Sequence, residues 1–285
     1  MRALHWRKWV GLGFIMPSLA GGMMFVGIPF FDAVRRSVTL PITGTFIGLD
    51  AYRAVFETPS FLRAAQNTGR FVLLCVPVLV VVSLLLALIL SEPVFGRGAL
   101  RSVFLLPMAI PVASVALLWQ VLFHRNGVIN ALIWTLGGAG IDWMKTDWAL
   151  FCLIISYVWK NLGYTMVLFL AGLSGINPAL YEAASVDGAG KGRQFFAITL
   201  PCLRPTMFTV TVLSLLNAFK AYREAYLVAG NYPHGSIYLL QHTLNNWFAA
   251  LEIEKLSAAA IVTAVVITAL VMLLNWTWSM NASWE

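Results

Sequence analysis

Long, uninterrupted runs of apolar residues dominate the pattern of this chain. Six runs are long enough for membrane helices, since a bilayer core about 30 Å thick needs roughly 20 apolar residues per helix. They cover approximately residues 10–31, 70–90, 103–123, 148–173, 207–228 and 257–278. Backbone polar groups in lipid must be satisfied within the protein, and these runs are too long for barrel strands. The pattern therefore predicts an all-α, polytopic membrane protein with six transmembrane helices.

Composition supports this prediction. The chain of 285 residues is 60% hydrophobic and only 11% charged, whereas soluble domains carry about 25% charged residues. The loops are too short for a separate soluble domain, so we expect residues 1–285 to form one transmembrane domain. The net charge of +7 would suggest nucleic acid in a soluble chain. Here it is better explained by basic residues near lipid head groups, and no nucleic-acid partner is expected.

The distribution of basic residues predicts the orientation. An even number of spans places both termini on one side of the membrane. With that side cytoplasmic, the inside segments carry the denser set of basic residues: Arg2, Arg7, Lys8, Arg97, Arg101, Lys191, Arg193 and Arg204. The positive-inside rule then favours cytoplasmic termini. The loop of residues 174–205, between the fourth and fifth spans, would also face the cytoplasm.

This loop contains a long polar segment, Glu182–Thr206. Leu180–Val186 is rich in helix-favouring residues, and the three glycines between positions 188 and 192 permit a sharp reversal with positive φ. Lys191–Thr199 can form a second short helix, which we expect Pro201 to stop. The segment is therefore predicted to form a compact helix–turn–helix protrusion.

The spacing in this segment, from Glu182-Ala-Ala184 through Gly188 to Leu200-Pro201, resembles a known pattern. It is similar to the EAA loop by which permease subunits of binding-protein-dependent ABC importers grip their ATPase. Residues 46–68, 85–119 and 127–132 also resemble permeases of the maltose and multiple-sugar ABC transporter family, in the family's order. The resemblance implies a type I ABC importer permease fold. It implies four kinds of partner: a second permease subunit, typically a different chain, an ABC ATPase dimer, an extracytoplasmic solute-binding protein and membrane lipid.

The resemblance also assigns residues to the contact with the ATPase. Small Ala183 and Ala184 would enter a groove, Glu182 would face a basic partner, and Phe195 and Phe196 would be apolar anchors. The full predicted coupling set is Glu182, Ala183, Ala184, Asp187, Gly188, Gly190, Phe195, Phe196, Ile198, Leu200 and Pro201.

A second set of polar residues lies within the spans on either side of the loop. Ionisable residues inside a span are costly and usually face a cavity or a partner. In the family these two spans line the translocation path, and aromatic, amide and hydroxyl groups suit sugars. The predicted pathway residues are Trp159, Lys160, Asn161, Tyr164, Asn217, Lys220 and Glu224. The alternative is that the charged side chains pair with each other or extend to the interface.

The sequence thus predicts a transport subunit rather than an enzyme. It has no Walker A motif and no metal-ligand spacing, so we expect no bound cofactor, with ATP and Mg²⁺ held by the partner ATPase. The resemblance implies import of a carbohydrate across a bacterial or archaeal cytoplasmic membrane. The basic residues hint at an anionic oligosaccharide. Glycerol phosphate, a polyamine or an oxyanion are alternatives for the same machinery, and a proton-coupled secondary transporter is an alternative of another class.

Overall fold

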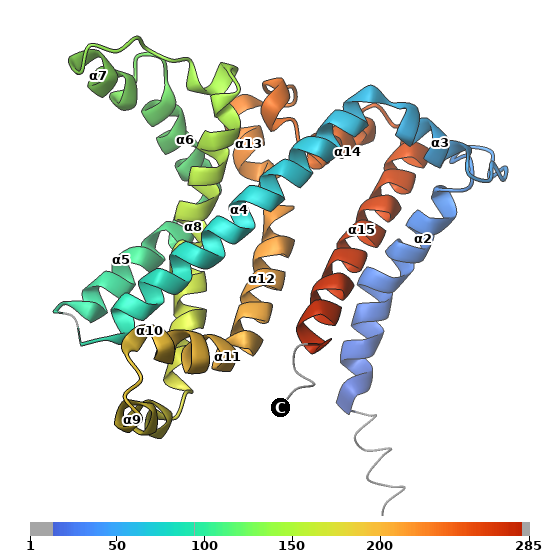
Figure 1. Ribbon diagram of the computed structural model, residues 1–285. Coiled ribbons are helices and arrows are strands. Elements are labelled where there is room, and N and C mark those ends of the chain that lie inside the picture. Colours follow the sequence, from blue (N-terminus) through green and yellow to red (C-terminus); the bar gives the residue numbers. More distant parts are fainter. Residues whose placement is uncertain (1–13, 94, 281–285) are drawn as a thin grey trace, which may run out of the picture. The chain divides into compact units, whose positions relative to one another are not determined.

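The computed structural model describes residues 14–93 and 95–280, and this part of the chain is almost entirely helical (Figure 1). The longer helices are α2 (Ile28–Arg36), α3 (Asp50–Glu57), α4 (Pro59–Ser91), α5 (Arg97–Ala109), α6 (Val112–Phe123), α7 (Val128–Thr135), α8 (Trp148–Ser174), α9 (Pro178–Val186), α12 (Arg204–Ala218), α13 (Tyr222–Ala229), α14 (Leu240–Ala249) and α15 (Ile253–Met280). Short elements are η1 (Met23–Gly27), η2 (Trp143–Lys145), α10 (Lys191–Gln194), η3 (Phe195–Thr199), α11 (Leu200–Cys202) and η4 (Gly235–Ile237).

The prediction of an all-α polytopic membrane protein is confirmed. Within the described residues, five helices are long and apolar enough to cross a membrane: Phe14–Arg36, Pro59–Ser91, Val112–Thr135, Trp148–Ser174 and Ile253–Trp278. Two further helices, Lys191–Cys202 and Arg204–Ala229, meet at a bend of 65° and make a sixth candidate span when they are counted together. The start of the first predicted span, residues 10–13, lies outside the described residues.

The third span differs from its prediction. Residues 103–123 do not form one helix, because α5 ends at Ala109 and α6 begins at Val112. Ile110 is extended (ψ 129°), as expected before Pro111, since a proline disfavours helical backbone in the residue before it. The candidate span starts after this break and runs through α7 to Thr135. The third span is therefore displaced toward the carboxyl terminus relative to the prediction.

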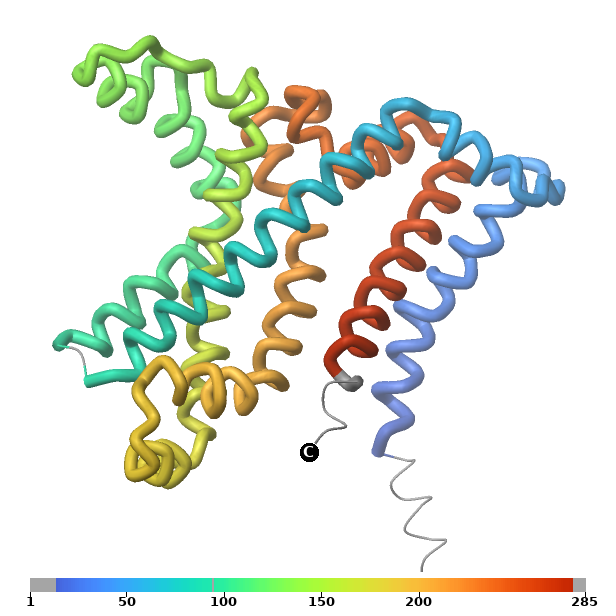
Figure 2. Tube along the Cα trace, in the orientation of Figure 1, coloured from blue at the N-terminus to red at the C-terminus, as the bar shows by residue number. Residues whose placement is uncertain are grey.

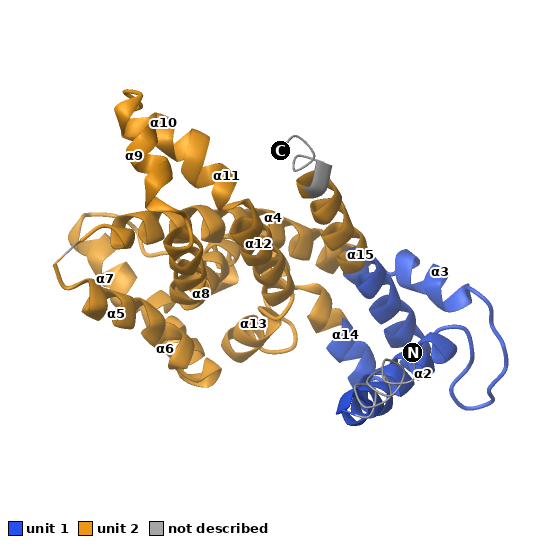
Figure 3. Cartoon of the chain, turned by 90° about the horizontal axis from the view of Figure 1, so that it is seen from below, with its two compact units in different colours: residues 1–61, 244–266 blue, residues 62–243, 267–285 orange. Residues whose placement is uncertain are grey.

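The described chain divides into two compact units (Figure 3). One combines residues up to 61 with residues 244–266. In it, the ring of Phe61 stacks on Trp247 with centroids 5.9 Å apart, and the Ser37 and Tyr52 hydroxyls are 2.8 Å apart. These contacts tie α3 and the start of α4 to the segment after α2 and to α14.

The other unit combines residues 62–243 with the chain from residue 267 onward, and it contains most of the buried core. Its long helices are α4, α8 and α12 (Figure 2). Near the middle of the core, the rings of Phe71 and Tyr157 meet edge to face at 5.5 Å. The Tyr157 hydroxyl donates a hydrogen bond to the Ser214 carbonyl oxygen at 2.8 Å, so one side chain links all three helices.

The polar pair Asn67-Thr68 in α4 positions the loop before α14. The Asn67 amide donates to the carbonyl oxygens of Gly235 and Tyr238, at 2.6 and 3.1 Å. The Thr68 hydroxyl accepts from the Leu240 amide at 2.9 Å. These bonds satisfy backbone groups that an irregular loop would otherwise leave unpaired.

Candidate functional site

The polar segment between the fourth and fifth spans folds into a helical hairpin beyond the end of α8 (Figure 1). Its first arm, α9, starts at a well-defined cap. The Asn177 side chain accepts a hydrogen bond from the Ala179 amide at 3.0 Å, and Pro178 occupies the first helical turn. Both features favour a helix start, since they satisfy or remove amides that have no partner within the helix.

Gly188 ends this arm and reverses the chain. Its φ is +78°, its amide bonds to the Ser185 carbonyl at 3.1 Å, and the next amide, Ala189, bonds to the Ala184 carbonyl at 2.8 Å. This is the Schellman arrangement, in which a left-handed residue follows the helix. The predicted reversal is confirmed at Gly188. It is wrong for Gly190, whose φ is −70°, and for Gly192, whose φ is not positive either.

The second arm continues further than predicted. Pro201 does not stop it, because the helical path runs from Lys191 to Cys202 and bends by 65° before Arg204. The stretch before Pro201, η3, is a π-helix. Proline has no N–H to donate, and a wider turn is one way for a helix to pass through such a position.

Side-chain hydrogen bonds join the two arms. The Tyr181 hydroxyl lies 2.8 Å from the Thr199 hydroxyl. The Gln194 amide donates to the Ser185 hydroxyl at 2.9 Å and to the Ala189 carbonyl at 3.0 Å. The hairpin is therefore braced at both its turn and its base.

The hairpin exposes part of the predicted coupling set. Glu182, Ala183 and Asp187 are exposed, and the Phe196 side chain is 70% exposed. Phe195 is half-buried against the core, so the two phenylalanines differ: one anchors the hairpin and one faces outward. The remaining half-buried members are Ala184, Ile198, Leu200 and Pro201.

Sequence reasoning missed Val186, which is 88% exposed at the end of α9. An apolar residue directly before Asp187-Gly188 was the available signal. Val186 and Phe196 are the most exposed large apolar side chains of the hairpin, and Leu180 in α9 is also exposed. Glu182 in α9 and Asp187 directly after it add negative charge on this arm. This combination suits a docking surface better than a lipid contact.

In the spans on either side, the structure joins two of the predicted pathway residues. The Lys160 ammonium in α8 lies 2.7 Å from a Glu224 carboxylate oxygen in α13, and the two side chains are 16% and 14% exposed. The residues are 64 positions apart in the chain. The pair leaves little net charge at this place, as expected for ionisable groups within a span.

The other predicted pathway residues lie nearby in two groups. Trp159 packs edge to face on Trp119 at 5.7 Å, and the Asn161 amide donates to the Tyr157 carbonyl within α8 at 2.8 Å. Tyr164 is half-buried. These three side chains follow one another along α8.

The second group surrounds a break in the fifth span. Residues 219–221 form a turn between α12 and α13. Lys220 is exposed in this turn, with its ammonium 3.5 Å from the Asn217 side-chain oxygen. Arg223, the second residue of α13, is also exposed. Unlike Lys160, neither cation is within 4.0 Å of a carboxylate among the described residues.

Comparison with known proteins identifies this architecture. Residues 80–277 match the family described as "Binding-protein-dependent transport system inner membrane component". The chain belongs to this family of permeases. The permease is therefore a non-catalytic transport subunit of a binding-protein-dependent ABC importer and a multi-pass inner-membrane protein.

Individual relatives cover nearly the whole permease. It is 31% identical to the sulfoquinovosyl glycerol transport system permease of Agrobacterium fabrum, over 92% of each chain. It is also 31% identical to the trehalose/maltose transport system permease of Thermococcus litoralis, over 90% of each chain. Its fold matches a crystal structure of a bacterial ABC transporter that imports the acidic polysaccharide alginate, with a TM-score of 0.83, 25% identity and coverage of 98% and 99%.

Proposed function

We propose that this permease, with a second permease subunit, forms the translocation pathway for a carbohydrate that carries an anionic group. A solute-binding protein delivers the carbohydrate, and an ABC ATPase dimer that holds ATP and Mg²⁺ drives the cycle through the α9–α10 hairpin. In this proposal both compact units belong to one transmembrane domain. The observation that carries the solute class is the pair of exposed, unneutralised cations, Lys220 and Arg223, at the break in the fifth span.

The proposed orientation places the hairpin and both termini in the cytoplasm. The hairpin carries Lys191 and Arg193, and the start of α5 carries Arg97 and Arg101 near the same ends of α4 and α8. This concentration of basic residues agrees with the positive-inside rule. An ATPase in the cytoplasm would then reach Glu182, Val186 and Phe196 from the solvent side.

Charge and the named relatives support the solute class together. Glu224 neutralises Lys160, so the positive charge available to a solute comes from Lys220 and Arg223. Two of the similar proteins are named for an acidic polysaccharide and for sulfoquinovosyl glycerol. A polyamine would be repelled by these two cations, which makes that alternative the weaker one.

The solute proposal predicts a charge-selective defect. In a Lys220→Gln/Arg223→Gln variant, uptake of an acidic oligosaccharide should fall about tenfold, because one lost charge-assisted contact amounts to roughly 1.4 kcal/mol or more. Uptake of a neutral oligosaccharide of the same length should change by less than about twofold. Radiolabelled uptake into proteoliposomes that contain the full transporter measures both. Lys145→Gln, which removes an exposed cation from the η2 loop, is the control, and equal losses for the two solutes would contradict the proposal.

The coupling proposal predicts a different defect at the hairpin. Gly188→Val places a β-branched residue at φ +78°, a conformation that costs about 1–2 kcal/mol or more for such residues. We expect the reversal to distort, and the ATPase activity stimulated by loaded binding protein to fall several-fold while the permease still inserts. Gly192→Val is the matched control, since Gly192 has no positive φ and a Cβ atom added there would meet nothing within 4 Å. If the ATPase activity of Gly188→Val were stimulated normally, the proposed coupling role of the hairpin would be contradicted, whatever solute is carried.

A further inference from the structure

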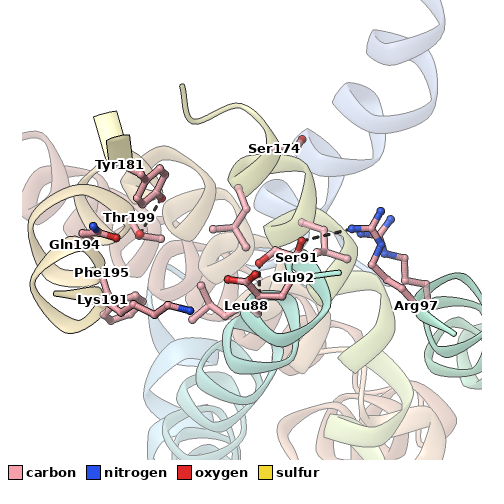
Figure 4. Close-up of a pocket in the computed structure, with 13 residues that line it drawn as sticks. Leu88, Ser91, Glu92, Arg97, Ser174, Tyr181, Lys191, Gln194, Phe195 and Thr199 are labelled. Carbon is pink, nitrogen blue, oxygen red and sulfur yellow. Dashed lines mark hydrogen bonds between the residues drawn. The ribbon is translucent and has the colours of Figure 1, made fainter. Parts of the chain in front are cut away.

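A cavity of about 740 Å³ lies where the ends of α4 and α8 meet the hairpin (Figure 4). Its walls come from the last turns of α4 and α8, the start of α5, and α9, α10 and η3. Leu88, Leu170 and Leu173 form an apolar side, while Ser91, Ser174 and Gln194 are among its polar residues. The cavity is far larger than the space one water molecule needs.

The charged lining of this cavity is predominantly positive. Arg97, Arg101 and Lys191 face it, against one carboxylate, Glu92. None of the four takes part in an ion pair within 4.0 Å among the described residues. The excess of two positive charges is therefore not neutralised by the protein.

The two arginines also have unused hydrogen-bonding capacity. Arg97 and Arg101 lie four positions apart in α5, on one helical face. Each makes only a long bond to a carbonyl oxygen, to Ser91 at 3.4 Å and to Leu90 at 3.3 Å. The Nε of Arg101 is buried without a partner in the described chain. A buried donor without an acceptor is unfavourable, and a guanidinium fork is suited to phosphate oxygens.

The position of the cavity indicates which phosphate would reach it. Its apolar side belongs to two helices long and apolar enough to span the membrane, and these end at Ser91 and Ser174. On α5, exposed Leu100 lies three positions after Arg97, on the same side of the helix. Basic pockets at the ends of membrane helices bind the head groups of anionic lipids. We infer that this cavity binds the phosphate head group of an anionic phospholipid.

Such a lipid would connect the membrane to the coupling hairpin. Lys191 and Gln194 come from the hairpin, whereas Arg97 and Arg101 come from α5. A phosphate held by both sides would replace repulsion between like charges by two attractions and fix the hairpin against α5. The coupling efficiency would then depend on the anionic lipid content, independently of which solute is transported.

The test uses the complete transporter in two sets of nanodiscs, one of phosphatidylcholine alone and one of phosphatidylcholine mixed with anionic phosphatidylglycerol. Native mass spectrometry measures the phosphatidylglycerol retained per complex, and ATPase activity measures coupling. We expect Arg97→Gln/Arg101→Gln to retain about tenfold less phosphatidylglycerol and to lose its stimulation. Arg125→Gln, which removes an exposed cation after α6, outside both the cavity lining and the hairpin, should behave as the wild type. Should the double variant fail to fold, Lys191→Gln alone should show a smaller loss of the same kind.

Three results would overturn the inference. Equal phosphatidylglycerol retention in the double variant and in Arg125→Gln would mean that the cavity does not select the lipid. An equal thermal shift from inorganic phosphate or ATP in lipid-free detergent, abolished by the arginine substitutions and not displaced by phosphatidylglycerol, would assign the site to a free anion. A loss of ATPase association in the double variant at every lipid composition would assign the arginines to the protein partner instead.

Discussion

Among the glycines that the structure describes, Gly163 should be the one whose replacement by alanine destabilises the permease most. Gly163 lies in α8 where α5 crosses, and a Cβ atom there would lie 1.9 Å from the Phe104 carbonyl oxygen and 2.4 Å from its carbonyl carbon. Both are backbone atoms, so no side-chain rotation relieves the overlap. Helices in membranes approach closely at small residues, and here the whole of α5 would have to move.

The expected size follows from overpacking. Extra methyl groups in packed interiors usually cost about 1–3 kcal/mol, and a clash with a helix backbone belongs at or above the upper end. We expect Gly163→Ala to lower the melting temperature in detergent by on the order of 10 °C and to reduce uptake strongly. Both can be measured on the solubilised transporter and on proteoliposomes.

Gly69→Ala provides the matched control for this substitution. Gly69 also lies inside a long helix, α4, and a Cβ atom there would have nothing within 4 Å. Alanine is favoured over glycine in helices by about 1 kcal/mol, so this variant should be neutral or slightly more stable. Equal melting temperatures for Gly163→Ala and Gly69→Ala would show that the backbone of α5 does not pack closely against α8 at Gly163.

The helical spans were predictable because their signal is local. Twenty consecutive apolar residues leave few alternatives to a membrane helix, and five of the six predicted runs coincide with helices or helix pairs of the described chain. The break at Pro111 was harder to foresee, because proline does not always break a helix. Pro77 and Pro107 both lie inside helices, and only the packing of neighbouring segments decides between the two outcomes.

The hairpin was predictable in outline for the same reason. Its reversal depends on Gly188, whose conformational freedom is a local property. The contacts that brace it, such as Tyr181 with Thr199, depend on the tertiary arrangement, as does the difference in exposure between Phe195 and Phe196. Pairings between distant segments, including Gly163 with Phe104, leave no trace in the local pattern.

The ion pair of Lys160 and Glu224 is a contact of this distant kind, and breaking it should have the second large effect. Lys160→Met would leave the Glu224 carboxylate 14% exposed and without its partner at 2.7 Å. Removing one member of a buried pair costs about 3–5 kcal/mol, because the remaining charge stays desolvated. We therefore expect Lys160→Met and Glu224→Met each to lower the melting temperature by on the order of 10 °C.

The double variant, Lys160→Met/Glu224→Met, decides what the pair does. Replacing a whole buried pair by apolar residues is often neutral, so stability should return to within about 1 kcal/mol of the wild type. If the pair only joins α8 to α13, uptake of the solute should return with stability. If either residue contacts the solute, as their place among the predicted pathway residues suggests, stability should return while uptake stays low. A double variant no more stable than the single ones would contradict the ion pair itself, because a coupled pair requires non-additive effects in the double-mutant cycle.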